Sequence, residues 1–316
     1  MERFDRRVDQ PIFERITVVG IGLIGSSILH AVRKRGLARS IVASDQSEAV
    51  CQRAKEIGFA DEVTGDIAGA VADSDLVILC IPVGEYGKIG PKIIPHLRSG
   101  AILSDVGSVK GCIFTAFAPV MRDDIHLIPA HPVAGTEHSG PDAGFATLFV
   151  NRWCILTPPA NADADAVAKL NLLWSEMGAN TETMSAEHHD LVLAITSHVP
   201  HLIAYNIVGT AADLEEVTRS EVIKFSAGGF RDFTRIAASD PTMWRDVFLN
   251  NKAAVLEMLG RFTEDLTALQ RMIRRGDGDG LFDLFTRTRA IRRSIIEIGQ
   301  ETAAPDFGRQ RINDKT

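Results

Sequence analysis

Two histidines and a glutamate stand close together in the stretch His131–Pro141, which reads HPVAGTEHSGP. Its two prolines and two glycines predict a loop rather than a helix or a strand. A histidine in such a loop has three interpretations: a packed structural residue, a metal ligand, or a base that faces a substrate. Which of these applies to His131 depends on the elements that position it.

The composition describes a globular protein with one large domain or two ordinary ones. The chain has 316 residues, of which 45% are apolar, and its net charge is −7. This acidic balance argues against a general nucleic-acid binder, which would carry a basic stripe. The four cysteines are scattered without a Cys-x-x-Cys pair, so we expect reduced thiols in the cytoplasm. No signal peptide is expected, because the N-terminus is charged and lacks an apolar run. No membrane span is expected, because histidine and proline interrupt the longest apolar stretches.

The first half of the chain alternates apolar runs with helical patterns. Helices are predicted at Ile24–Gly36 and Ser47–Gly58. Strands are predicted at Ile16–Gly20, Ile41–Asp45, Asp75–Pro82, Ala101–Ser108 and Ile125–Pro132. Nearly continuous runs of valine, isoleucine and leucine between helices indicate a mostly parallel sheet covered on both faces. Trp153–Pro159 and, more weakly, Ala179–Met184 are expected to extend that sheet.

Helical periodicity replaces the strand pattern from about Ala186. Asp240 and Pro241 are a good helix start, and this helix is expected to reach about Arg275, where GDGDG breaks it. A last helix is expected at about Leu281–Ile298. We therefore predict an α/β Rossmann-like domain over residues 1–185 and an all-helical domain over residues 186–316. The apolar faces of the long helices call for a second subunit or, alternatively, a single packed bundle.

A glycine-rich motif, GIGLIG, joins the first predicted strand to the first predicted helix. In a G-x-G-x-x-G motif Gly20 permits a tight turn, Gly22 lets the backbone approach a pyrophosphate, and Gly25 lets helix and strand pack closely. Asp45 lies twenty residues beyond Gly25, at the end of the next strand. A carboxylate there binds the ribose hydroxyls of NAD and repels the extra phosphate of NADP, so we expect NAD rather than NADP.

Ligands of such sheets gather at the carboxyl ends of the strands. Cys80–Val83, Asp105–Lys110 and the His131 loop all follow strands at that edge, which weakens the interpretation of His131 as a packed structural residue. The cofactor-binding residues predicted in addition to the three glycines and Asp45 are Leu23, Ile24, Ile81, Pro82, Val83 and Ser108.

At this point the sequence closely resembles the prephenate/arogenate dehydrogenase family of tyrosine biosynthesis. The matching segments are GIGLIGSS, SDVGSVKG, AHPVAGTEHSG, SHVPH and GGFRDFTRIAASDPTMWRD, in family order between residues 20 and 246. The resemblance implies a Rossmann-like domain followed by a helical domain that forms a homodimer. It also implies NAD(P)-dependent oxidation of prephenate or arogenate with loss of carbon dioxide, giving 4-hydroxyphenylpyruvate or tyrosine.

The resemblance also implies roles for individual residues. His131 matches the histidine that hydrogen-bonds the ring hydroxyl of the substrate, and Ser108 matches a serine that links this histidine to the nicotinamide. His201 and Arg235 match substrate-binding positions. The other substrate-binding positions are Thr136, Glu137 near the mouth of the site, Asp232 close to Arg235, and Trp244 as a wall.

Oxidation and decarboxylation of such a substrate require a base and a cationic side chain. The hydroxyl proton must pass to a base, and a neutral imidazole with a pKa near the working pH suits that task. An arginine pairs well with a carboxylate of the substrate. His198 and His201 share a helix face because they are three residues apart, and Pro200 between them is expected to kink the helix.

Other interpretations remain open at this stage. The candidate metal ligands, which include His131 with His138, match no standard zinc pattern, so no metal is expected. His138, His188 and His189 are expected to be exposed or to cap a helix. Another NAD(P)-dependent dehydrogenase or an imine reductase would share the fold but would be expected to use a lysine of the helical domain. A non-enzymatic NAD sensor would need an effector module. The preference between prephenate and arogenate, and inhibition by tyrosine, are open.

Overall fold

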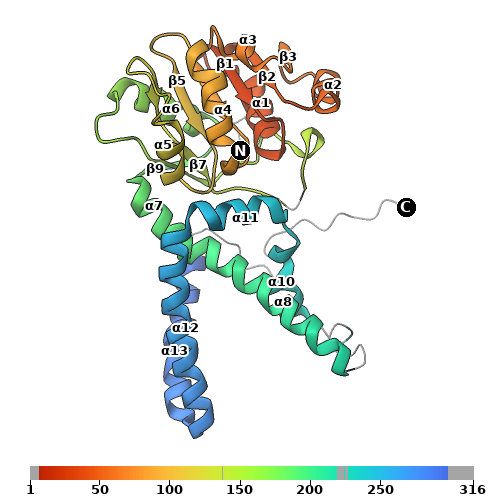
Figure 1. The fold of residues 1–316 in the computed structure, drawn as a ribbon, viewed down its shortest axis with the longest axis vertical. Helices are drawn as coiled ribbons and strands as arrows, with labels where there is room; N and C mark the ends of the chain where they lie inside the picture. Colours follow the sequence, from red (N-terminus) through yellow and green to blue (C-terminus); the bar gives the residue numbers. More distant parts are fainter. Residues whose placement is uncertain (1–6, 137, 219–223, 225–226, 298–316) are drawn as a thin grey trace. The chain divides into compact units, whose positions relative to one another are not determined.

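The computed structural model describes residues 7–136, 138–218, 224 and 227–297. Its first half is built on a six-stranded sheet in which every strand pair is parallel (Figure 1). In spatial order β3-β2-β1-β4-β5-β6, the strands are Glu62–Thr64, Ala38–Ser44, Phe13–Val19, Leu76–Leu79, Ile102–Asp105 and His126–Leu127. The strand order reverses between β1 and β4, and ligands of doubly wound sheets bind at such a reversal. The predicted Rossmann-like fold is confirmed.

Helices cover both faces of this sheet. They are α1 (Leu23–Arg35), α2 (Glu48–Ile57), α3 (Ile67–Val71), α4 (Tyr86–Ile93), α5 (Gly111–Phe117) and α6 (Ala164–Glu176). All four residues of β4 are buried; Leu76 and Ile78 belong to one apolar cluster, whereas Val77 and Leu79 belong to another. Alternate side chains thus enter two cores, which is the reason that this strand is apolar throughout.

The ends of the first two helices follow from local residue chemistry. Gly36 ends α1 with a φ of 70°, a left-handed conformation that glycine adopts without steric cost. The side chain of Ser47 caps α2 by accepting a hydrogen bond from the amide of Val50, and Gly58 ends that helix in the same left-handed region. The predicted ends of both helices at these residues are confirmed.

A second, three-stranded sheet corrects two of the sequence predictions. The expected strand Ile125–Pro132 is split into β6 and β7 (Ala130–Pro132), with Pro129, which has no amide donor, between them. β7 pairs antiparallel with β8 (Trp153–Leu156), and β8 pairs parallel with β9 (Asn180–Thr183). The segments at Trp153 and Ala179 therefore do not extend the six-stranded sheet, and that prediction is wrong.

The second half is helical, as predicted. Its helices are α7 (Ala186–Leu193), a π turn (Ala194–His198), α8 (Val199–Thr218), α10 (Gly228–Thr234), a 3₁₀ turn (Arg235–Ala238), α11 (Pro241–Asn250), α12 (Lys252–Arg275) and α13 (Gly278–Glu297). Asp240 caps α11 by accepting from the amides of Thr242 and Met243. The predicted helix from Asp240 to Arg275 is wrong in one respect, because it breaks at Asn251 into α11 and α12.

Two further features concern the extent of these elements. Contacts within the chain divide it into compact units at residues 1–256 and 257–316, so that α12 begins in the first unit and ends in the second. The helical stretch Ala186–Asp213 runs through the histidines and the proline that were expected to interrupt it, and by length and composition alone it could cross a membrane. It buries His189, Asp190 and His198, all hydrogen-bonded, which is the behaviour of a helix packed on a protein interior.

Candidate active site

The glycine-rich turn between β1 and α1 has the geometry that a dinucleotide requires. Gly20 has a φ of 95°, and a Cβ atom on it would overlap the carbonyl of Cys80. A Cβ atom on Gly25 would overlap the carbonyl of Gly20, whereas one on Gly22 would meet nothing within 4 Å. The first and third glycines therefore allow close packing, and the second leaves the backbone open to a pyrophosphate.

Asp45 lies directly after β2 and is bonded to this turn. Its Oδ2 accepts a hydrogen bond of 2.9 Å from the amide of Ile21, and its Oδ1 accepts one of 2.9 Å from the amide of Ser47. A carboxylate retains further acceptor positions for a ribose hydroxyl. The N-terminus of α1 has no side-chain cap and no acidic residue in its first turn, so its amides suit an anionic ligand. The turn thus fits a bound dinucleotide.

The loop that follows β4 lies at the same edge of the sheet. Ile81 is half-buried, Pro82 is exposed and Val83 is buried. Val83 packs on Gly107 so closely that a Cβ atom on this glycine would lie 2.6 Å from Val83 Cγ1. The structure therefore brings the predicted cofactor residues of this loop beside the turn that precedes Ser108.

His131 lies on β7, beside the carboxyl end of β5. The amide of its neighbour Ala130 donates to Asp105 Oδ1, and Lys110 Nζ donates to the carbonyl of Ala130 at 2.7 Å. His131 belongs to the strand Ala130–Pro132, so the predicted strand end at Pro132 is confirmed, whereas the loop expected from His131 onwards begins only after Pro132. The expected position of His131 at the carboxyl edge of the sheet agrees with these contacts.

A buried polar cluster supports this strand from behind. Lys110 and Asp105 form an ion pair, and both side chains are fully buried. Tyr86 Oη and the amide of Gly107 also donate to Asp105 Oδ2. Burial raises the pKa of Tyr86, so its hydroxyl stays protonated as a donor. The cluster fixes the backbone of Ala130 and places the positive charge of Lys110 close to His131.

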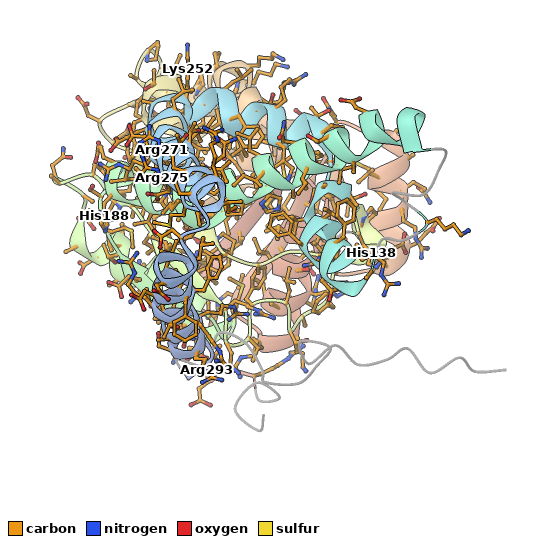
Figure 2. All side chains as sticks on the ribbon, turned by 90° about the horizontal axis from the view of Figure 1, so that it is seen from below. His138, His188, Lys252, Arg271, Arg275 and Arg293 are labelled. Carbon is orange, nitrogen blue, oxygen red and sulfur yellow. The ribbon has the colours of Figure 1, made fainter. Side chains whose placement is uncertain are left out.

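His131 has a buried partner that the sequence analysis assigned to the surface. Its Nδ1 lies 2.8 Å from His189 Nε2, and His189 Nδ1 lies 2.8 Å from Asp190 Oδ1. His189 is 0% exposed, so the expectation that it is exposed or caps a helix is wrong. His188 and His138 are exposed, as expected, and both are labelled in Figure 2.

A signal for His189 was present in the sequence. The buried residues of α7 are Ala186, His189, Asp190 and Leu193, which follow the three- and four-residue spacing of one helix face. His188 lies off that face. Burial lowers the pKa of His131 well below its ordinary value, and the charges of His189, Lys110 and His198 lower it further. Burial likewise lowers the pKa of His189. Both imidazoles are therefore neutral near pH 7.

A second group of aromatic residues lies on α8 and α11. His201 stacks on Trp244 with ring centroids 3.7 Å apart, and His198 meets the same indole edge-on. The predicted shared face of the two histidines is thereby confirmed. The π turn Ala194–His198 ends two residues before Pro200, which has no amide proton to continue an α-helical hydrogen-bond pattern.

Arg235 lies in the exposed 3₁₀ turn after α10, which is tied to α8 by the hydrogen bond from Tyr205 Oη to the carbonyl of Ser239. Burial lowers the pKa of His201, and the charge of Arg235 lowers it as well, so these two predicted substrate residues lie within electrostatic reach of each other. Asp232, on α10, is exposed.

The remaining predicted residues stand as follows. Thr136 is exposed and accepts a hydrogen bond from the amide of His138. Ser108 is half-buried, and its backbone tends to raise the pKa of His198. The imidazole of His198 is also hydrogen-bonded to the side chain of Asn251. Glu137 lies outside the described residues. Among the residues that the structure describes, no group of three or more His, Cys, Asp or Glu side chains is arranged to hold a metal ion.

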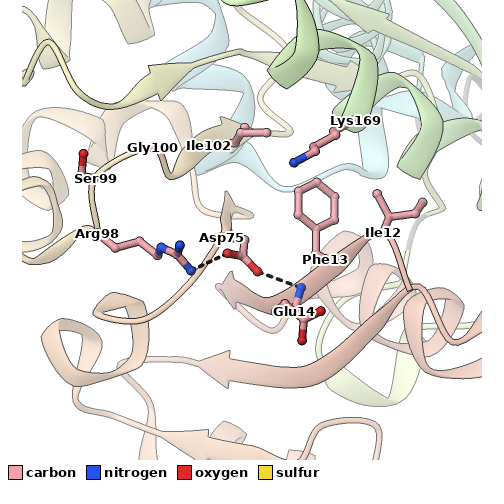
Figure 3. A pocket seen from close by; sticks show the side chains of 9 residues that line it. All are labelled: Ile12, Phe13, Glu14, Asp75, Arg98, Ser99, Gly100, Ile102 and Lys169. Atoms are coloured by element: carbon pink, nitrogen blue, oxygen red, sulfur yellow. Dashed lines mark hydrogen bonds and ion pairs between the residues drawn. The ribbon is translucent and has the colours of Figure 1, made fainter. Parts of the chain in front are cut away.

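A hollow of about 380 Å³ lies elsewhere (Figure 3). It opens at the amino ends of β1, β4 and β5, the edge of the sheet opposite to the glycine-rich turn. Arg98 on its rim is paired with Asp75, which also accepts from the amide of Glu14. This hollow is therefore separate from the candidate active site.

Comparison with known proteins identifies the family of the chain. Residues 28–183 match the family described as prephenate dehydrogenase, nucleotide-binding domain, and residues 185–287 match prephenate dehydrogenase, dimerization domain. The chain belongs to the prephenate dehydrogenase family. It is 42% identical to cyclohexadienyl dehydrogenase of Zymomonas mobilis, over 90% of this chain and 97% of that protein. It is 32% identical to prephenate dehydrogenase of Bacillus subtilis, over 93% of this chain and 79% of that protein.

Solved structures of the family share the fold. Prephenate dehydrogenase from A. aeolicus, in complex with hydroxyphenyl propionate and NAD+, has a TM-score of 0.83 and 32% identity, over 89% of this chain and 98% of that chain. Arogenate dehydrogenase from Synechocystis has a TM-score of 0.77 and 27% identity, over 89% of this chain and 99% of that chain. The family recognition made from the motifs is confirmed.

Proposed function

We propose that this protein catalyses the NAD-dependent oxidative decarboxylation of prephenate, arogenate or both, giving 4-hydroxyphenylpyruvate or tyrosine. The observation that carries the proposal is a neutral, buried His131 at the carboxyl edge of the sheet that also bears the glycine-rich turn. The relatives named above as cyclohexadienyl, prephenate and arogenate dehydrogenases support the substrate class.

NAD would be held by the turn Gly20–Gly25, with Leu23 and Ile24 at the start of α1, and by Asp45, Ile81, Pro82, Val83 and Ser108 at the same edge of the sheet. When bound, it supplies the two-electron oxidant. The Asp45 carboxylate would favour NAD over NADP, because it stands where the 2′-phosphate of NADP would bring a second negative charge.

His131 would accept the proton of the ring hydroxyl as the carbon that bears this hydroxyl is oxidised. Because burial lowers the pKa of His131 below that of an ordinary imidazole, the ring is neutral and can act as a base at pH 7. The ring carboxylate then leaves as carbon dioxide, its bonding electrons complete the aromatic ring, and the phenolate oxygen takes the proton back from His131. Ser108, by the same resemblance, would link His131 to the nicotinamide.

The substrate would lie against the aromatic group of α8 and α11. Arg235 would pair with a carboxylate, His201 would offer its Nε2 as an acceptor to the substrate, and the indole of Trp244 would form a wall. The resemblance adds Glu137 near the mouth of the site, Asp232 close to Arg235, and Thr136 as a further substrate-binding residue. An exposed guanidinium close to a half-buried imidazole suits an anionic ligand that arrives from solvent.

The assembly follows from the helices at the end of the chain. α12 and α13 expose large apolar side chains: Leu266, Ile273, Phe282, Phe285 and Ile291. Apolar surface of this extent is typical of a protein interface. We infer a cytoplasmic homodimer formed through the helical half, with the domain boundary at residue 185. The separate matches to residues 28–183 and 185–287 support that boundary.

Turnover of purified protein tests the function. Prephenate and arogenate are each supplied with NAD and with NADP, and reduction of the nicotinamide is followed by absorbance. We expect NAD-dependent turnover of at least one substrate with release of carbon dioxide, and the ratio of the two kcat/KM values gives the preference. A β-hydroxyacid is the control substrate. Turnover of that control, and of neither cyclohexadienol, would refute the proposal.

A further inference from the structure

His189 and Asp190 form a chain of hydrogen bonds behind His131 for which the motif resemblance supplies no role. Three polar groups occur in series: the imidazole of His131, the imidazole of His189 and the carboxylate of Asp190. His131 comes from β7 and the other two from α7, on either side of the predicted domain boundary. The first of these two buried bonds joins side chains 58 residues apart, and together the bonds specify one arrangement of the site.

The anchor of this chain is the Asp190 carboxylate. Its Oδ1 accepts a hydrogen bond from the amide of Lys110 and its Oδ2 accepts one from the amide of Gly111, each at 2.8 Å. Amide groups can only donate to it, and a carboxylate that receives them is an acceptor on both oxygens. His189 Nδ1, which lies 2.8 Å from Oδ1, must therefore carry a proton and donate it to Asp190.

The remaining protons follow from this assignment. A neutral imidazole has one N–H group, so His189 Nε2 is an acceptor. The atom that donates to it is His131 Nδ1, and the same rule leaves His131 Nε2 without a proton. The unprotonated Nε2 is the nitrogen that can take a proton from a substrate. The buried chain thus determines which of the two nitrogens of His131 is the base.

We propose that His189 and Asp190 are positioning residues that hold His131 in the Nδ1–H tautomer and so direct its basic Nε2 to the substrate hydroxyl. The proposal rests on the proposed function of His131 as the base. When His131 accepts a proton, its Nδ1–H bond to His189 persists, and the carboxylate of Asp190 lies two hydrogen bonds away. No group in the chain has to move for the proton transfer.

Asn251 supports the same arrangement from the helical side. Its Nδ2 donates to the carbonyl of Asp190 at 2.8 Å, and the same atom lies 3.1 Å from His198 Nδ1. The carbonyl requires a donor, which fixes the orientation of the amide and makes His198 Nδ1 an acceptor. Asn251, at which the predicted long helix breaks, thus links α7 to α11 by a hydrogen bond.

Three variants of His189 separate positioning from packing. His189→Gln places an amide carbonyl near the position of Nε2 and can accept from His131. His189→Asn keeps a donor for Asp190 but is too short to reach His131. His189→Leu fills the space without polar atoms. If the tautomer matters, the glutamine variant retains function and the other two do not, whereas a merely structural role would not rank the variants in that way.

The direct readout is the tautomer of His131, measured by NMR of protein labelled with ¹⁵N-histidine and needing no turnover. His131→Asn identifies its signals. We expect the Nδ1–H tautomer in the parent and in His189→Gln, and a shift to the Nε2–H tautomer in His189→Leu. An Nε2–H tautomer in the parent, or the parent tautomer unchanged in His189→Leu, would overturn the proposal.

Kinetics give the second readout. The wrong tautomer of a catalytic histidine costs up to about 10⁴-fold in kcat. We expect kcat to fall by roughly 10²-fold or more in His189→Leu and His189→Asn, and by less than about tenfold in His189→Gln, with KM little changed. Equal kcat values in the three variants would count against the proposal. A parent enzyme that turns over neither prephenate nor arogenate would refute the proposed function, while the NMR result would still decide the tautomer.

Discussion

The imidazole of His201 lies flat on the indole of Trp244, with ring centroids 3.7 Å apart and an angle of 24° between the planes. His201 Nδ1 donates a hydrogen bond to the carbonyl of Ser197, so its Nε2 is an acceptor while the ring is neutral. Burial lowers the pKa of His201 and thereby favours that neutral form. One side of the candidate substrate site is therefore a rigid aromatic surface with a fixed acceptor at its edge.

Replacement of the proposed base has a direct consequence. His131→Asn should lower kcat by roughly 10²- to 10⁴-fold, because a positioned acid-base group contributes that much. Affinity for NAD should hardly change, since the glycine-rich turn and Asp45 are untouched. Steady-state kinetics and NAD titration measure both quantities. His138→Asn, at an exposed position of the same segment, is the control, and a kcat near the parental value in His131→Asn would refute the role.

The pH profile provides a further check on this base. The base is active when unprotonated, and burial lowers the pKa of His131 below 6.5. kcat/KM should therefore be level near pH 7 and should fall only at pH values below 6.5.

The buried histidines also predict a loss of stability in acid. Burial lowers the pKa of His198 from 6.5 to about 4. Between these values the unfolded chain binds a proton that the folded chain does not, so the free energy of unfolding falls as the pH falls, by about 2 kcal/mol between pH 7 and pH 5. Urea unfolding at the two pH values measures this. His198→Asn should reduce the loss, whereas His188→Gln, at an exposed histidine, should leave it unchanged; the reverse ranking would contradict the assignment.

Cofactor choice should change with Asp45. Asp45→Ser removes the negative charge that would face the 2′-phosphate, so the ratio of kcat/KM for NADP to that for NAD should rise. The structure adds a cost, because the amides of Ile21 and Ser47 both lose an acceptor, and we expect a loss of about 1–3 kcal/mol in stability. Kinetics with both cofactors and a denaturation curve test these points. An unmoved cofactor ratio in a folded variant would show that Asp45 does not select NAD.

Arg235 should control substrate affinity. Removal of one partner of a desolvated charge pair costs about 2–5 kcal/mol, equivalent to roughly 30- to 4,000-fold in kcat/KM. Arg235→Gln should raise KM for the substrate strongly and leave NAD binding intact. Arg231→Gln, at an exposed arginine of α10, is the matched control. An unchanged KM together with a lowered melting temperature would mean that Arg235 is structural.

The apolar surface of α13 should be needed for assembly. Phe282 and Phe285 are 70% and 56% exposed, and an aspartate at either position would place a charge in the proposed interface. Phe282→Asp and Phe285→Asp should shift the protein from dimer to monomer in sedimentation experiments, whereas Arg289→Asp on the same helix should shift it less. A monomeric parent protein would rule out the proposed dimer.

Local patterns were sufficient for the glycine-rich turn and the first two helices, and tertiary contacts explain where predictions elsewhere were wrong. The turn at Gly20, the helix end at Gly36 and the carboxylate of Asp45 depend on neighbours in sequence, and each is where the motif predicted it. The break at Asn251 could not be predicted, because it depends on the carbonyl of Asp190, 61 residues away.

In the candidate active site, too, some features follow from local sequence and others depend on tertiary contacts. Motif matching found His131, which the structure places at the expected edge of the sheet, but the partner of His131 was assigned to the surface. The spacing of α7 places His189 on its buried face, but the pairing with His131 depends on the approach of β7, which no local pattern indicates. The split of Ile125–Pro132 into two strands is also a matter of context, since β6 pairs with β5 and β7 pairs with β8.

The hydrogen bond between His131 and His189 limits how the two halves of this protein can be separated. A fragment that ends at residue 185 would contain the turn that binds the nucleotide but neither His189 nor Asp190. Such a fragment could retain affinity for a dinucleotide, yet its His131 would have no partner to select the tautomer. The nucleotide-binding half is therefore not an interchangeable module: in a chimaera made from two relatives, the catalytic base of one parent would depend on a side chain inherited from the other.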